Sequence, residues 1–370
     1  MALSALQRDR LTALLRALVD QHRARVLIEP NRRQSGFWFG GGNLVQDGEG
    51  TLWLSGRYRN VGDSRLGLEA GERGLECALF ASRDGGRSFQ KQRSWSKAEL
   101  SRPEARVVSI EGTALHRRPD GIWELYVSSE KAWEYPSEQR AYLKPGCGVW
   151  SIDVLSGPSP DRLETASLRQ VLREADDAAW LHVKDPVVYA QPDGCTHLIY
   201  CSHPYCWSSA NTGLAVRDPG AGEFRVETRQ LVPRGPAWDV AGTRVTCRLA
   251  VPRLGVFAAL SALSVLFYDG LECVRQHEEN RRAVMRPRGY SCEELGGAMV
   301  GFDDEFPRYE RLSQLAPLFV SPYGSGCSRY VDVLACGDRL VATWQQSQDD
   351  LSQPLVSHEL PMAEVARLLA

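Results

Sequence analysis

The chain has no long apolar run and almost no net charge. None of its stretches approaches the roughly 20 consecutive apolar residues that a membrane-spanning helix needs. Its 44 Lys and Arg residues are balanced by 46 Asp and Glu residues, so the formal net charge is only −2. That balance lacks the basic excess typical of a protein that binds duplex nucleic acid. With 43% hydrophobic and 24% charged residues, the 370-residue chain has a globular composition, and we expect neither a membrane nor a nucleic-acid partner.

Cysteine motifs for metal binding are also absent. The ten cysteines include no CxxC pair and the seven histidines are scattered, so no zinc-site spacing occurs. Several cysteines lie in apolar runs, such as Cys247 in RVTCRLAV and Cys336 in DVLAC, and buried free thiols are typical of a reducing compartment. The N-terminal segment carries Arg8, Asp9 and Arg16 inside any candidate apolar core, which does not fit a signal peptide. We therefore expect a cytoplasmic protein.

Both ends of the chain show helical patterns. Residues 1–28 are predicted to hold an amphipathic helix, because leucines fall near helical spacing at Leu3, Leu6, Leu11, Leu14, Leu15 and Leu18. Residues 361–370, with the sequence PMAEVARLLA, predict a second short helix that begins near Pro361. We expect both helices to cap the main body, with a homodimer contact through the N-terminal helix as the alternative.

Residues 29–360 show an all-β pattern with an internal repeat. Short runs of β-branched and aromatic residues alternate with Gly, Pro and Asp turns. An apolar strand, a tight turn with glycine and a second apolar strand occur together five times, at intervals of 61 to 82 residues, with turn glycines Gly50, Gly121, Gly194, Gly255 and Gly337. A repeat of this length holds two hairpins, so five repeats predict a five-bladed β-propeller as a single domain. A two-sheet sandwich would not repeat the same hairpin five times.

One turn motif supports the propeller. Ser82–Phe89 reads SRDGGRSF and matches the Asp-box pattern SxDxGxxF/W, which resembles turns of sialidases and other glycan-acting propellers. Asp84 can accept N–H bonds from its own turn, and the glycines permit left-handed backbone. The motif predicts a structural role in an outer hairpin and says little about catalysis.

Polar residues stand where the innermost strands of successive repeats begin: Glu111, Asp185, Arg244, Arg329 and Tyr330. Lys184-Asp185-Pro186 resembles the Asp-Pro segment of five-bladed glycosidases of the arabinanase and invertase type, and Glu111-Gly112-Thr113 is a looser match to their Glu segment. The resemblance implies a glycoside hydrolase that cleaves a small oligosaccharide or glycoside with paired carboxylates in the propeller funnel.

The sequence departs from that family at two points. Gly40-Gly41-Gly42-Asn43 stands in the first repeat where the family carries an aspartate, and the Glu segment precedes the Asp segment. Cleavage of a glycosidic bond needs one protonated and one ionised carboxyl group, about 5–5.5 Å apart for retention and 6.5–9.5 Å for inversion. We expect Glu111 to be the acid, because its apolar flank predicts a raised pKa. Asp185, beside Lys184 and His182, is expected to stay ionised as base, nucleophile or stabiliser.

Three further carboxylates are candidate catalytic groups. Glu293 and Glu294 close a long polar insertion before the outer hairpin of the fourth repeat, and long insertions in compact folds are usually functional or disordered. Asp239, in AWDVAGTR, is a similar candidate.

The candidate substrate-binding residues suggest alternatives to a two-carboxylate mechanism. They are Arg57, Arg244, Arg329, Tyr330, His182, Trp38 and Asn43. Converging arginines bind carboxylates, so a sialidase-like hydrolase of an acidic sugar with a tyrosine nucleophile is one alternative. A non-catalytic propeller that binds a glycan or a protein is another. We expect no cofactor and no catalytic metal, while a structural calcium ion near the axis stays open.

Overall fold

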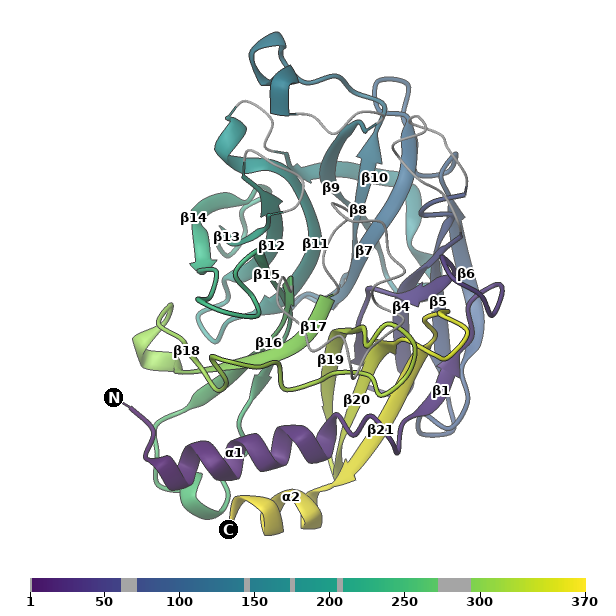
Figure 1. Ribbon diagram of the computed structural model, residues 1–370. Helices are drawn as coiled ribbons and strands as arrows, with labels where there is room; N and C mark the ends of the chain where they lie inside the picture. The colour runs from purple at the N-terminus through teal and green to yellow at the C-terminus, as the bar shows by residue number, and fades with distance from the viewer. Residues whose placement is uncertain (1, 61–71, 143–146, 174–176, 205–208, 272–293) are drawn as a thin grey trace.

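The computed structural model describes residues 2–60, 72–142, 147–173, 177–204, 209–271 and 294–370. Five antiparallel sheets surround a central axis, and the innermost strands of neighbouring sheets contact one another around the ring (Figure 1). The predicted all-β, five-bladed propeller with terminal helices is confirmed.

Each blade runs from the axis outward in chain order, apart from the last. Blade 1 holds β2 (Trp38–Gly40), β3 (Leu44–Gln46), β4 (Leu52–Arg59), β5 (Glu76–Ser82) and β6 (Gln90–Ser96). Blade 2 holds β7 (Val107–Arg117), β8 (Trp123–Lys131), β9 (Val149–Gly157) and β10 (Glu164–Leu172). Blade 3 holds β11 (Leu181–Ala190), β12 (Thr196–His203), β13 (Asn211–Arg217) and β14 (Arg225–Val232). Blade 4 holds β15 (Gly242–Ala250), β16 (Leu263–Leu271), β17 (Glu294–Phe302) and β18 (Glu310–Arg311).

Blade 5 is built from both ends of the chain. It holds β19 (Ser328–Cys336), β20 (Arg339–Gln346), β21 (Leu355–Pro361) and, on the outside, β1 (Arg25–Ile28). Because β1 pairs with β21, the N-terminal strand closes the ring. This strand lies before residue 29, where the sequence led us to expect the propeller to begin. The Arg25 guanidinium also donates to the carbonyl oxygens of Gly86 (2.6 Å) and Arg87 (2.9 Å), which ties blade 5 to blade 1.

The turn glycines behave as their pattern predicts, with one exception. All five have positive φ, from +51° to +89°, a region that other residues adopt only with strain. Gly50, Gly121, Gly194 and Gly337 lie in short turns between paired strands. The tight turn expected at Gly255 is wrong, because residues 251–262 separate β15 from β16 and include a short 3₁₀ helix. This longer connection packs under the C-terminus, where a Cβ on Gly255 would lie 2.0 Å from the Leu369 carbonyl oxygen.

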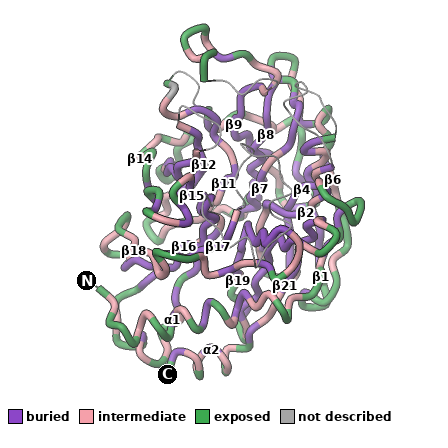
Figure 2. Tube along the Cα trace, in the orientation of Figure 1, coloured by how far each residue is buried: buried purple, intermediate pink, exposed green. Residues whose placement is uncertain are grey.

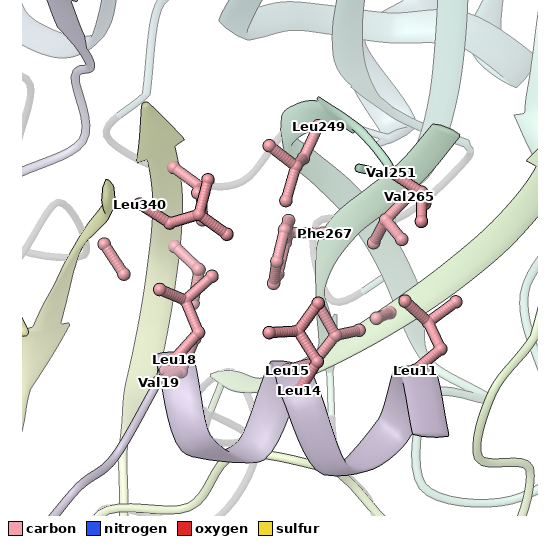
Figure 3. Packing of buried hydrophobic residues seen from close by; sticks show 14 of the residues in the cluster. Leu11, Leu14, Leu15, Leu18, Val19, Leu249, Val251, Val265, Phe267 and Leu340 are labelled. Carbon is pink, nitrogen blue, oxygen red and sulfur yellow. The ribbon is translucent and has the colours of Figure 1, made fainter. Parts of the chain in front are cut away.

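The two terminal helices pack against each other under blades 4 and 5. Helix α1 (Ala5–Leu18) begins with a capping box between Ser4 and Gln7, and α2 (Met362–Leu369) follows β21 directly. Four leucines of α1 are buried against strands of both blades, as Figure 3 shows for Leu11, Leu14, Leu15 and Leu18, whereas Leu6 is exposed. These four leucines are covered by their own chain, so the structure gives no support to a homodimer through them.

The interior consists of apolar layers between blades, and the exposed residues gather in turns and loops (Figure 2). No helix in the described part of the chain is long and apolar enough to span a membrane. The cysteines within the described ranges are free thiols.

The segment Ser82–Phe89 forms the turn between β5 and β6, away from the axis. Asp84 Oδ1 accepts from the Ser82 hydroxyl (2.7 Å) and the Ser88 backbone N–H (3.0 Å), and Ser82 Oγ accepts from the Gly86 N–H (2.8 Å). Its role here is to hold a turn. Its likeness to the Asp boxes rests on the sequence pattern.

Candidate active site

Irregularities in the innermost strands position the polar cluster at the axis. In blades 2 to 5 the register between the innermost strand and its neighbour shifts at residues 110–113, 184–187, 245–247 and 329–332. Shifts of this kind, as at β-bulges, re-aim side chains and are common next to active sites. They occur at or next to Glu111, Asp185, Arg244 and Tyr330, the residues around which the polar cluster is built.

Blade 1 has glycines at the positions where blades 2 and 3 have an acidic residue. Its innermost strand is split into β2 and β3 around Gly41 and Gly42, so no carboxylate stands there. A Cβ on Gly40 would come within 2.5 Å of the Gln345 side chain, and the Cβ position of Gly41 lies 3.5 Å from the Tyr330 ring. The glycines therefore let Arg57, on the next strand β4, reach the cluster: its Nη2 lies 3.4 Å from the Tyr330 hydroxyl.

Asp185 lies at the centre of the cluster. Its Oδ1 accepts from the Gly112 N–H (3.1 Å) and the Tyr330 hydroxyl (3.3 Å), and its Oδ2 accepts from Arg244 Nη1 (3.3 Å). Asp185 and Tyr330 both adopt left-handed backbone, at φ +54° and +53°. Such conformations cost on the order of 1–3 kcal/mol in non-glycine residues and gather at functional sites.

Glu111 faces a cation, not apolar residues. Arg57 Nη2 lies 3.3 Å from Glu111 Oε2, and the Ser109 hydroxyl donates to Oε1 (2.9 Å). Burial raises the pKa of Glu111, but Arg57 and Lys184 outweigh it and hold the pKa below its ordinary value. The raised pKa expected from the apolar flank is therefore wrong, because Ile110 packs between blades while the carboxylate faces Arg57.

The neighbouring cations lower the pKa of two other carboxylates in the cluster but not of a third. Burial raises the pKa of Asp185, yet Lys184 and Arg244 keep it below the ordinary value, which fits the ionised group expected there. Glu294 contacts Arg244 (3.0 Å) and Arg329, and these cations hold its pKa far below normal despite burial. Asp269 is the exception, because burial raises its pKa to about 6.

Asp269 was not predicted from the sequence, although it organises the cluster. Its Oδ2 accepts from Arg244 Nε (3.1 Å) and Nη2 (2.6 Å), and its carboxylate also accepts the Tyr330 backbone N–H (3.0 Å). The signal was one acid inside the otherwise apolar strand LSVLFYDGL. Arg59, the last residue of β4, has its guanidinium 4.3 Å from the centre of the Trp38 ring.

The remaining candidates from the sequence lie at varying distances from this cluster. Trp38 belongs to it, since the guanidinium of Arg329 lies 4.1 Å from the ring centre. His182, the second residue of β11, is buried against Tyr135 and the Trp150 ring. Asn43 pairs through its side-chain amide with the backbone N–H (2.7 Å) and carbonyl (2.9 Å) of Leu115, which joins blades 1 and 2.

Of the two other candidate acids, one lies away from the cluster and one lies outside the described residues. Asp239 accepts from the Tyr268 hydroxyl (3.0 Å) and Arg311 Nε (2.7 Å), farther out in blade 4. Glu293 lies outside the described residues. Within the described ranges, no group of three His, Cys, Asp or Glu side chains is placed to hold a metal ion.

The space along the axis is uneven. A cavity of about 380 Å³ lies along the later halves of the innermost strands, where Asp332 is the one carboxylate among its described lining residues. A much smaller cavity, of about 10 Å³, borders Gly41, Gly112, Asp185 and Tyr330. The described lining of the large cavity therefore has no carboxylate pair, and Asp185 borders the smaller cavity.

Comparisons with known proteins find similar folds among solved structures. No family model and no curated protein matches the sequence. Among solved structures, a native arabinanase from Bacillus subtilis aligns with a TM-score of 0.52 and 13% identity, over 90% of this chain and 97% of that one. A thermostable family-43 glycoside hydrolase aligns with a TM-score of 0.54 and 9% identity, over 90% and 91% of the two chains. A β-1,2-mannobiose phosphorylase from Listeria innocua aligns with a TM-score of 0.52 and 11% identity, over 93% and 96%.

These similarities confirm the predicted resemblance at the level of the fold. The chain has the five-bladed propeller architecture shared by the arabinanase and the family-43 hydrolase.

Proposed function

We propose that the protein is a glycoside hydrolase acting on a small oligosaccharide or glycoside, with Asp185 and Glu111 as its working carboxylates. The observation that carries the proposal is their position on adjacent innermost strands, with Asp185 Oδ1 hydrogen-bonded to the N–H of Gly112, the residue after Glu111. A propeller built only for binding has no need to hold such a pair inside an arginine cluster at the cost of left-handed backbone. The solved relatives include hydrolases of this architecture.

The two carboxylates have different roles in this scheme. Asp185 is ionised and serves either as the base that activates the attacking water or as the nucleophile that attacks the anomeric carbon. Glu111, whose side chain is 14% exposed, donates its proton to the leaving oxygen as the C–O bond breaks. The oxygen of water then joins the anomeric carbon, and its proton returns to a carboxylate. Because one relative is named a phosphorylase, inorganic phosphate in place of water is a further acceptor to test.

A second mechanism is favoured by the surroundings of Tyr330. The guanidinium groups of Arg57, Arg244 and Arg329 lie 5.7, 4.0 and 5.4 Å from the centre of its ring. Its hydroxyl contacts Asp185 Oδ1, so Tyr330 could attack the sugar while Asp185 takes the proton. Burial raises the pKa of Tyr330, so attack by its oxygen requires such a base.

The test is turnover of aryl glycosides carrying arabinofuranosyl, xylosyl, fructosyl, galactosyl, glucuronyl and sialyl groups, each with and without inorganic phosphate. Asp185→Asn and Glu111→Gln are expected to lose at least about 10³-fold in kcat on the sugar that reacts. Glu124→Gln is the matched control, because Glu124 is a buried acid paired with Arg217 away from the cluster. Tyr330→Phe separates the mechanisms: a comparable loss supports the tyrosine nucleophile, and a small one supports the carboxylate pair. Full activity of both carboxylate variants would overturn the site assignment.

A further inference from the structure

We propose that the cluster contains a binding site for an oxyanion, formed by Arg57 and Arg329 beside Tyr330. The inference rests on the proposed function and deepens it, because it gives one part of the substrate or co-substrate a negative charge. The oxyanion is either a carboxylate on the sugar or free inorganic phosphate, and the two share the same chemistry toward guanidinium groups.

The first support is unused hydrogen-bonding capacity. Arg57 is 2% exposed and Arg329 is 5% exposed. Even so, Nε and Nη1 of Arg57 and Nη2 of Arg329 have no hydrogen-bond partner among the described residues. The same holds for Nε2 of the neighbouring Gln345, although its Oε1 accepts from Arg329 Nε (2.9 Å). A buried donor left unpaired costs about 1–3 kcal/mol, more when charged, so four of them on three neighbouring side chains call for a ligand.

The second support is the local charge. The charges of both proposed ligand-binding arginines act on Arg59, and burial together with the charges of Arg57, Arg73 and Arg329 lowers its pKa to about 10. The Trp38 ring lies within 4.3 Å of Arg59 and 4.1 Å of Arg329, which fixes the orientation of both guanidinium groups. Crowded cations in a buried site repel one another, and an oxyanion relieves that repulsion.

The chemistry of the donors fits an oxyanion better than a neutral sugar hydroxyl. Guanidinium groups donate only, and they bind planar carboxylates and phosphate oxygens through several charge-assisted N–H bonds. The carboxylates Glu111 and Glu294 pair with other nitrogens of the same two arginines, Glu111 with Nη2 of Arg57 and Glu294 with Nη1 of Arg329. An incoming oxyanion therefore completes each guanidinium group and leaves its existing ion pair in place.

The site also links binding to Glu111. An oxyanion on Arg57 offsets the positive charge that holds the pKa of Glu111 down, so a bound anion prepares Glu111 to hold the proton that it must donate. The charged groups that act on Glu111 in the free protein are Arg57, Arg59, Arg73, Lys97, Glu130, Lys184 and Asp185.

Calorimetric titration of the purified protein tests the site without requiring turnover. The probes are inorganic phosphate, D-glucuronate and D-glucose, in buffer matched in ionic strength with sodium chloride. At least one of the two oxyanions is expected to bind with one site per chain, and glucose is not. Phosphate alone identifies a free co-substrate, and glucuronate alone identifies a carboxylate on the sugar.

Variants assign the binding to the two arginines. Arg57→Gln and Arg329→Gln are each expected to weaken the bound oxyanion at least tenfold, and Arg329→Lys, which keeps the charge but loses Nη2, less so. Arg217→Gln is the matched control, since Arg217 is also 5% exposed and pairs with Glu124 elsewhere. Binding no tighter than that of chloride, or unchanged in both glutamine variants, overturns the proposal. Since no catalysis is measured, failure of the hydrolase proposal and failure of this one are distinguishable.

Discussion

The substitution Asp185→Asn probes the centre of the proposed site with little change of shape. Asparagine Oδ1 can still accept from the Gly112 N–H and the Tyr330 hydroxyl. Its amide NH₂, however, would face Arg244 Nη1, which lies 3.3 Å from Oδ2 in the wild type. Arg244 keeps Asp269 and Glu294 as partners, so the variant is expected to fold. We expect a loss of about 1–3 kcal/mol in the free energy of unfolding, the cost of one mismatched buried pair.

The effect on catalysis should be much larger than the effect on folding. Without an ionised carboxylate the variant has no base or nucleophile, so kcat on the reactive aryl glycoside should fall by about 10³-fold or more, equivalent to about 4 kcal/mol of barrier. Asp185→Ala opens space beside Arg244 for azide, a small anion. Added azide should raise the rate of this variant at least tenfold. The assay is aglycone release under saturating substrate, with the folded fraction measured in parallel.

The control is Asp153→Asn, because Asp153 is also a buried acid paired with a cation, Lys131, but lies away from the cluster. It should lose stability and keep its turnover per folded molecule. The reasoning about Asp185 is refuted if Asp185→Asn retains activity within tenfold of the wild type, or if Asp153→Asn loses as much turnover per folded molecule as Asp185→Asn does.

Three further predictions concern the fold. Leu15→Ala should cost about 2–5 kcal/mol in chemical denaturation, because Leu15 is fully buried under blades 4 and 5, whereas Leu6→Ala on the exposed face should cost less than about 0.5 kcal/mol; equal costs would contradict the packing of α1. Gly42→Ala should lower the melting temperature by several degrees, since a Cβ there would lie 2.1 Å from the Ser55 carbonyl oxygen, and an unchanged melting temperature would contradict that close approach. Burial raises the pKa of Asp332 to about 6, so between about pH 4 and 6 the native state keeps a proton that the unfolded state loses, and the free energy of unfolding falls as the pH rises through this range. Asp332→Asn should remove up to about 3 kcal/mol of this decrease. Parallel curves of stability against pH for the variant and the wild type would contradict the prediction.

The architecture was largely readable from the sequence, because a propeller repeats local signals. The same strand–glycine–strand pattern recurs with its own turn chemistry, and the second hairpin that the repeat length predicts is present in blades 1 to 4. The closure of blade 5 was missed, since the four residues Arg25–Ile28 lack any local signal of their own and become a strand only by pairing with β21. The long connection at Gly255 was missed for a similar reason, because it is shaped by contact with a helix more than 100 positions later.

The candidate site was only partly predictable. Glu111, Asp185, Arg244 and Tyr330 were found because position in the repeat decides which residue begins an innermost strand. Their partners come from other blades, so no spacing in the sequence reveals that Arg57 pairs with Glu111. The direction of the Glu111 pKa was consequently predicted wrongly from its neighbours along the chain.

The most direct test of the central claim is the fate of solvent oxygen during turnover. The wild-type protein is incubated in ¹⁸O-enriched water with the aryl glycoside it cleaves, and the released sugar is analysed by mass spectrometry before its anomeric oxygen exchanges. Hydrolysis predicts that the sugar gains one ¹⁸O and the aglycone none, and that Asp185→Asn yields neither product above background. Label in the aglycone, or no sugar released from any glycoside of the panel, would contradict the account.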